Sequence, residues 1–121
     1  MTAMKSYFFE DLQLGQQAQL SKTVGEKDIV AFAELSGDRN PVHLDAEYAA
    51  KTMFKERIAH GMLTAAYISA VFGMQLPGPG AIYLEQTLRF HRPVALGDRV
   101  TVTVTAKAKD PKRPRVTFAC A

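Results

Sequence analysis

An aspartate and a histidine lie five residues apart in the segment SGDRNPVH, residues 36–43. At about 3.6 residues per turn, side chains five positions apart point away from each other on a continuous α-helix. Gly37 can end a helix with a positive φ, and Pro41 disfavours helical backbone in the residue before it, so the segment predicts a helix break. Across such a break Asp38 and His43 can share one water and move its proton, which predicts a general acid/base pair. The alternative is a capped helix end followed by a turn.

A second signal begins at His60-Gly61 and continues through the uncharged, apolar run GMLTAAYISAVFG, residues 61–73. A helix that is apolar on every side is expected to be buried, and this one is too short to span a bilayer. The N–H groups of a first helical turn have no partners within the helix, and a glycine there lets a ligand approach them closely. The run therefore predicts a site that stabilises negative charge on an oxygen. An ordinary loop-to-helix entry is the alternative.

The composition limits the function classes. A chain of 121 residues with a formal net charge of +3 predicts one domain. No long run of Lys and Arg with interleaved aromatic residues is present, so we expect no nucleic-acid partner. One cysteine, Cys120, and three histidines make a zinc site by spacing improbable, and an internal disulfide is excluded. We expect no signal peptide and no membrane span, and therefore a cytoplasmic protein.

The pattern of apolar residues predicts the elements that must position these groups. Helices are expected over residues 26–35, from the Asp45 cap to residue 50, and over residues 61–73. Strands are expected over residues 18–24, 81–91 with a bulge, 99–105 and 116–121. One buried helix followed by antiparallel strands predicts an α+β fold in which the sheet wraps around a central helix, the hot-dog architecture.

Three runs carry a family resemblance: AFAELSGDRNPVHLDAEYA, FKERIAHGMLTAAYISAVFG and LRFHRPVALGDRV. They resemble the MaoC-like (R)-specific enoyl-CoA hydratases, including those that feed polyhydroxyalkanoate synthesis. The similarity covers about Phe9 to Phe118, which favours residues 1–121 as a single MaoC-like domain. The resemblance implies hydration of trans-2-enoyl-CoA to (R)-3-hydroxyacyl-CoA by a homodimer. We expect no metal or other cofactor.

The resemblance also implies roles for individual residues. Asp38 and His43 would hold the catalytic water, and the Gly61 N–H would bind the thioester oxygen. A serine matching Ser69 would lie close by, and the acyl pocket would run along the region of Phe72. From the residue types themselves we expect Asn40 to fix the loop or add a hydrogen bond, and we place Asn40 and His60 with Gly61 and Ser69 in the substrate-binding group. Simpler structural roles compete for three of these, because Asn40 suits an Asx turn, Ser69 a small packing position and Phe72 the core.

Other functions on the same fold stay open from the sequence. They are an acyl-carrier-protein dehydratase, a thioesterase, and a non-catalytic hot-dog subunit that binds acyl-CoA. Relatives of this kind usually continue for another strand, without which one edge of the sheet would be open. We therefore expect either that the sequence lacks a C-terminal strand or that the fold closes differently.

Overall fold

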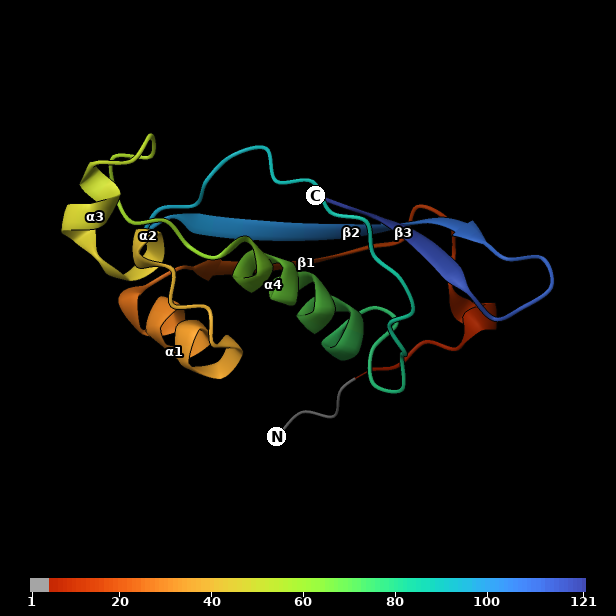
Figure 1. Cartoon of the computed structure of the whole chain (residues 1–121). Helices are drawn as coiled ribbons and strands as arrows, with labels where there is room; N and C mark the ends of the chain where they lie inside the picture. Colours follow the sequence, from red (N-terminus) through yellow and green to blue (C-terminus); the bar gives the residue numbers. More distant parts are fainter. Residues whose placement is uncertain (1–4) are drawn as a thin grey trace. The chain divides into compact units, whose positions relative to one another are not determined.

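The computed structural model describes residues 5–121 (Figure 1). The chain divides into two compact units. The first unit comprises Met1–Leu20, Ala66–Gln86 and Thr101–Ala121, and the second comprises Ser21–Ala65 and Thr87–Val100. The elements follow in the order η1 (Phe9–Asp11), β1 (Gln17–Thr23), α1 (Glu26–Ser36), α2 (Pro41–Leu44), α3 (Ala46–Ala50), α4 (Gly61–Met74), β2 (Arg99–Lys109) and β3 (Val116–Cys120). No described helix is long and apolar enough to cross a membrane. The expectation about a signal peptide involves residues 1–4, which lie outside the described residues.

The three strands form one sheet in the order β1-β2-β3. β2 and β3 are antiparallel, with Val104 opposite Cys120 and Lys109 opposite Val116. Alternate side chains of β2 are buried, with Val102, Val104 and Ala106 in the core, as the period-two pattern predicts. The strand runs to Lys109, beyond the predicted end at residue 105, and its ladder with β3 has a register shift between Ala106 and Ala108.

The predicted strand over residues 81–91 is wrong, because no strand forms there. Alternating apolar residues favour extended backbone, but a strand also needs a neighbour to complete its hydrogen bonds. Residues 81–87 are exposed, including Ile82 and Leu84. The predicted bulge of this segment is likewise absent, and the irregularity occurs in β2 instead.

Helix α4 begins at Gly61 as predicted and extends to Met74. It buries one stripe, formed by Leu63, Tyr67 and Val71 at four-residue spacing. The expectation that α4 is buried on every side is therefore wrong for the single chain, since Met62 and Met74 are more than half exposed. The helix is apolar all round, and its other faces are only partly covered.

The second unit holds α1 and the two short helices that follow it. Asp28 accepts a hydrogen bond from the Gly25 N–H at 2.8 Å, which fixes the start of α1, and Ile29 and Ala33 bury its inner face. The helix ends at Gly37, whose φ of 82° is the left-handed conformation that glycine adopts without strain. The predicted helix break is confirmed. The Asp45 carboxylate then caps α3, as expected, by accepting hydrogen bonds from Glu47 and Tyr48.

Candidate active site

The loop after α1 holds Asp38 by short-range hydrogen bonds. The Asp38 N–H donates to the Ser36 hydroxyl at 3.1 Å, and the Asp38 Oδ1 accepts from the Asn40 N–H at 3.2 Å. Asn40 in turn caps α2, because its Oδ1 accepts from the Val42 N–H at 3.2 Å. Two successive Asx turns thus shape the loop. They occupy one carboxylate oxygen of Asp38, leave the second for other partners, and give Asn40 the loop-fixing role.

His43 lies in α2 and is buried, with both its ring and its main chain held by the segment that precedes α4. The ring Nδ1 lies 2.7 Å from the Ile58 carbonyl oxygen. A carbonyl only accepts hydrogen bonds, so Nδ1 carries the proton, and in the neutral ring Nε2 presents a bare lone pair. The Arg57 Nε–H donates to the His43 carbonyl at 2.7 Å, and the Arg57 guanidinium pairs with both carboxylate oxygens of Glu26 at 2.6 and 3.2 Å. Two consecutive residues therefore fix His43.

His60 is the most deeply buried polar residue among those described, with 2% of its surface exposed. Its Nε2 lies 2.9 Å from the main-chain carbonyl oxygen of Asp38, so Nε2 carries the proton. The ring stacks on His43 with centroids 3.9 Å apart and an interplanar angle of 29°. Its Nδ1 is buried and has no hydrogen-bond partner among the described residues.

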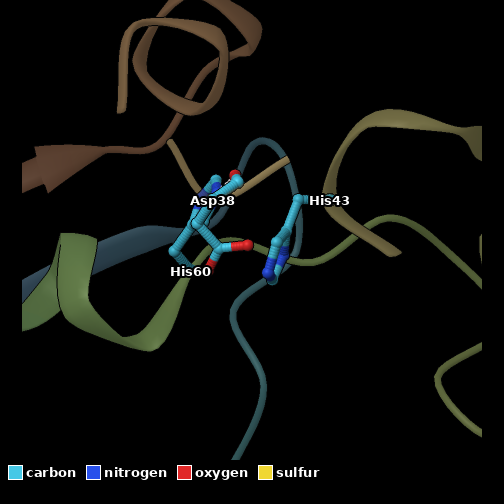
Figure 2. A group of neighbouring side chains, drawn as sticks. All are labelled: Asp38, His43 and His60. Carbon is cyan, nitrogen blue, oxygen red and sulfur yellow. Dashed lines mark hydrogen bonds between the residues drawn. The ribbon is translucent and has the colours of Figure 1, made fainter. Parts of the chain in front are cut away.

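The structure brings Asp38, His43 and His60 together, with one potential ligand atom from each within 4.8 Å of the others. Figure 2 shows one carboxylate oxygen of Asp38 directed toward the His43 ring. Three such donors could suggest a metal site, but a metal binds a histidine in the plane of its ring at about 2.0–2.1 Å. The two stacked rings lie at only 29°, so their in-plane lone pairs do not converge on one ion. The geometry favours proton transfer over chelation, and the absence of a cofactor stays a prediction.

Gly61, the first residue of α4, follows His60 directly. As a first-turn donor its N–H has no partner within the helix. A Cβ built on Gly61 would lie 2.9 Å from the Phe90 ring, so only glycine fits beneath that ring without a shift. The helix start can thus present N–H groups to an oxygen of a ligand that approaches closely.

An open cavity of about 440 Å³ lies beside these groups in the second unit. Asp38, His43, His60 and Gly61 line it together, and most of the remaining wall is apolar. The other lining residues are Phe54, Ile58, Ala59, Met62, Thr64, Phe90, His91, Arg92, Pro93 and Val94. A carboxylate, an imidazole and helix N–H groups therefore face one largely apolar space that can accept a small ligand.

The other predicted site residues do not line this cavity. Asn40 caps α2, as its Asx-turn alternative predicts, and Ser69 is exposed on α4. Phe72 contacts the rings of Tyr83 and Phe118, at centroid distances of 5.1 and 5.0 Å. The substrate-binding role of Ser69 and the acyl-pocket role of Phe72 stay predictions.

Sequence reasoning missed three contributors to the site. Phe90 lies in the run LRFHRPV, and nothing in that run indicates that its ring packs against Gly61 at the start of α4. That contact is seen only in the structure. Arg57 is visible in the sequence only as a charged residue in a loop. The Ile58 carbonyl belongs to the main chain, so the residue type at position 58 does not predict its hydrogen bond to His43.

Comparison with known proteins adds independent findings. A family model described as a MaoC-like domain matches residues 10–119. An (R)-specific enoyl-CoA hydratase of Rhodospirillum rubrum is 55% identical over 112 residues, which are 93% of this chain and 78% of the relative. The unliganded R-hydratase PhaJ1 of Pseudomonas aeruginosa superposes with a TM-score of 0.90 at 54% identity, over 97% of this chain and 75% of that chain. The (R)-hydratase from Aeromonas caviae involved in PHA biosynthesis superposes with a TM-score of 0.89 at 47% identity, over 92% of this chain and 84% of that chain. The structural matches confirm the predicted α+β hot-dog fold.

Proposed function

Because the chain belongs to the MaoC-like domain family, we propose that it is an (R)-specific enoyl-CoA hydratase, a hydro-lyase that adds water to trans-2-enoyl-CoA. The high identity to hydratases over most of the chain supports this activity. The product is the (R)-3-hydroxyacyl-CoA thioester.

The reaction needs two features on opposite sides of the substrate. As the water oxygen bonds to C3, the electrons of the double bond move toward the thioester carbonyl, so its oxygen needs a hydrogen-bond donor. The water must also lose a proton to a base. The cavity offers both, since Asp38, His43 and the start of α4 at Gly61 all line it.

We assign the proton steps to Asp38 and His43. The free carboxylate oxygen of Asp38 and the bare Nε2 of His43 are both acceptors, so together they can hold the two O–H bonds of one water. Asp38 takes one proton as the oxygen attacks C3, while Nε2 of His43 accepts a hydrogen bond from the other O–H and orients the water. The proton held by Asp38 is then delivered to C2. One proton and one hydroxyl are added in total, so the two residues end in their starting states and no redox cofactor is consumed.

The thioester oxygen is assigned to the N–H of Gly61. Its charge develops only as C2 becomes enolate-like, so a donor placed there stabilises the transition state more than the substrate. Removing one such donor typically lowers kcat by roughly 10²–10³-fold.

The observation that carries this proposal is the shared cavity of Asp38, His43 and Gly61. The test is turnover of a panel of trans-2-enoyl-CoA thioesters, with chiral analysis of the products. The proposal expects (R)-3-hydroxyacyl-CoA, and loss of turnover in Asp38→Ala. An (S) product, release of free coenzyme A thiol without hydration, or equal rates for variant and parent would contradict it.

We further propose a homodimer in the cytoplasm, with residues 1–121 acting as one domain and acyl-CoA as the substrate. Several large apolar side chains of the described chain are exposed, which a second copy would cover. They include Met62, Met74, Ile82, Leu84 and Phe90. Light scattering coupled to size-exclusion chromatography tests the dimer, and a monomer at micromolar concentration would exclude it. By analogy with the Aeromonas caviae protein, the product is proposed to enter polyhydroxyalkanoate synthesis.

A further inference from the structure

We propose that His60 is a positioning residue, which holds both Asp38 and His43 in the geometry required for proton transfer. This inference rests on the proposed hydratase function and deepens it. His60 touches both members of the pair, whereas the sequence predicts only a place among the substrate-binding residues.

The first contact is to the main chain of Asp38. The His60 Nε2–H donates to the Asp38 carbonyl at 2.9 Å from a buried position, across 22 residues of sequence. The other hydrogen bonds at Asp38 are local, since its N–H donates to the Ser36 hydroxyl at the end of α1 and its Oδ1 accepts from the Asn40 N–H. His60 therefore supplies the long-range contact that fixes where this loop lies.

The second contact is to the ring of His43. The two rings stack at 3.9 Å, and Phe32 of α1 contacts His60 at 4.8 Å with a tilt of 58°. The Ile58 carbonyl fixes one atom of the His43 ring, which still permits a change of ring plane about that bond. The stacked face of His60 restricts that plane and so directs Nε2 of His43.

A direct role for His60 at the substrate is disfavoured by its nitrogens. Nε2 is occupied by the Asp38 carbonyl, and Nδ1 is buried, so neither is available to a ligand in the cavity. Only the face and carbon atoms of the ring remain to form cavity wall. Acting through two other residues is thus the role that its contacts support.

The test compares His60→Phe, which keeps a flat ring but has no donor, with His60→Gln, whose amide nitrogen can still reach the Asp38 carbonyl. Hydration of crotonyl-CoA gives kcat, and titration with non-reacting butyryl-CoA gives the dissociation constant. We expect His60→Phe to lower kcat by roughly 10²-fold, since small displacements of reacting groups have effects of this size. Butyryl-CoA should bind as to the parent, and His60→Gln should recover part of kcat, because it restores the contact to the Asp38 carbonyl but not the stacked ring. The matched control is Ile29→Val, a core truncation in α1 of the same unit, which should leave kcat unchanged.

The inference is overturned if His60→Phe retains the parental kcat, or if Ile29→Val loses as much. It is also overturned if His60→Phe loses butyryl-CoA binding to the same extent as kcat, which would indicate direct substrate contact. If the parent protein hydrates no enoyl-CoA, the proposed function is contradicted but the positioning role of His60 is not. In that case the ¹⁵N resonances of the His43 ring still test positioning, because they should shift between parent and His60→Phe. Should His60→Phe not fold, His60 in the parent must show the Nε2–H tautomer, and the Nδ1–H tautomer would overturn the inference.

Discussion

The stacked rings of His43 and His60 carry their protons on opposite nitrogens. His43 donates from Nδ1 to the Ile58 carbonyl, and His60 donates from Nε2 to the Asp38 carbonyl. With centroids 3.9 Å apart, the two rings are close in position and differ in chemistry. Only the free nitrogen of His43 is available to act on a ligand.

This relationship predicts two distinct tautomers in solution. Long-range ¹H–¹⁵N correlation spectra of the labelled protein should show a proton on Nδ1 of His43 and on Nε2 of His60. The chain has three histidines, so His43→Gln and His91→Gln variants complete the assignment. Finding the same tautomer in both stacked rings would contradict the hydrogen bonds described.

Asp38→Asn separates the chemistry of Asp38 from its structural role. The asparagine Oδ1 can still accept from the Asn40 N–H, so the loop should keep its shape, while the base is lost. We expect kcat for crotonyl-CoA to fall by about 10²–10⁴-fold with little change in thermal stability. The control is Asp45→Asn, since Asp45 also caps main-chain N–H groups in this unit but does not line the cavity. A similar loss of kcat in both variants would refute the assignment of Asp38.

Gly61→Ala tests the close approach at the start of α4. The new methyl group would lie 2.9 Å from the Phe90 ring, and because Phe90 is 58% exposed the ring can move aside. We therefore expect a loss of stability below the ~1–3 kcal/mol typical of overpacked cores, but a clear fall in kcat/KM. Adding Phe90→Ala should recover part of that loss, and a double-mutant cycle measures the coupling.

A second glycine of the same helix provides the control for this experiment. A Cβ added at Gly73 would meet no neighbouring atom within 4 Å, and alanine favours helix more than glycine does. Gly73→Ala should therefore raise the melting temperature and leave kcat/KM unchanged. Equal kinetic losses in the two alanine variants would show that the effect of Gly61→Ala is not local.

Arg57→Lys and Glu26→Gln separate the two contacts of Arg57. Lysine lacks the Nε–H that binds the His43 carbonyl and cannot reproduce the forked pairing with Glu26. We expect kcat to fall between about 10- and 10²-fold in Arg57→Lys, through displacement of His43. Glu26→Gln removes only the ion pair with Arg57, in which the Glu26 carboxylate is largely exposed. Such a pair contributes about 0–1 kcal/mol to stability, so kcat should stay near the parental value. A larger loss of kcat in Glu26→Gln than in Arg57→Lys would contradict this separation of the two contacts.

Burial raises the pKa of the Cys120 thiol, so less of it is thiolate at a given pH than in an exposed cysteine. Burial also raises the pKa of Tyr83, with a further contribution from Cys120. A group whose pKa is higher in the folded protein than in the unfolded chain makes its full contribution to the free energy of unfolding below its unfolded-state pKa. This contribution is lost as the pH rises through its folded-state pKa. Alkylation of Cys120 should therefore need a higher pH in the folded protein than in urea, with Cys120→Ser as the blank. Identical pH profiles in both states would contradict the shift.

Features set by neighbouring residues could be predicted from the sequence. The end of α1 at Gly37, the cap at Asp45 and the start of α4 at Gly61 all follow from local backbone chemistry, and the structure confirms them. The meeting of Asp38 with His43 also followed, because a helix break between them was visible in the residue types.

Features set by distant partners could not be predicted in the same way. Residues 81–91 alternate like a strand, yet forming one depends on a neighbouring strand that alternation does not specify. The stacking of His60 on His43 joins residues 17 positions apart, and the Ile58 carbonyl acts through the main chain. Such contacts arise only when the chain has folded.

Five consecutive residues, 57–61, supply the contacts to the ring and the carbonyl of His43, the long-range contact to Asp38 and the first N–H of α4. The two halves of the reaction centre therefore share a single stretch of backbone, and an insertion or deletion there would displace both at once. Redesign of the substrate range should accordingly leave this stretch intact and vary the cavity wall at Phe54, Phe90 and Val94.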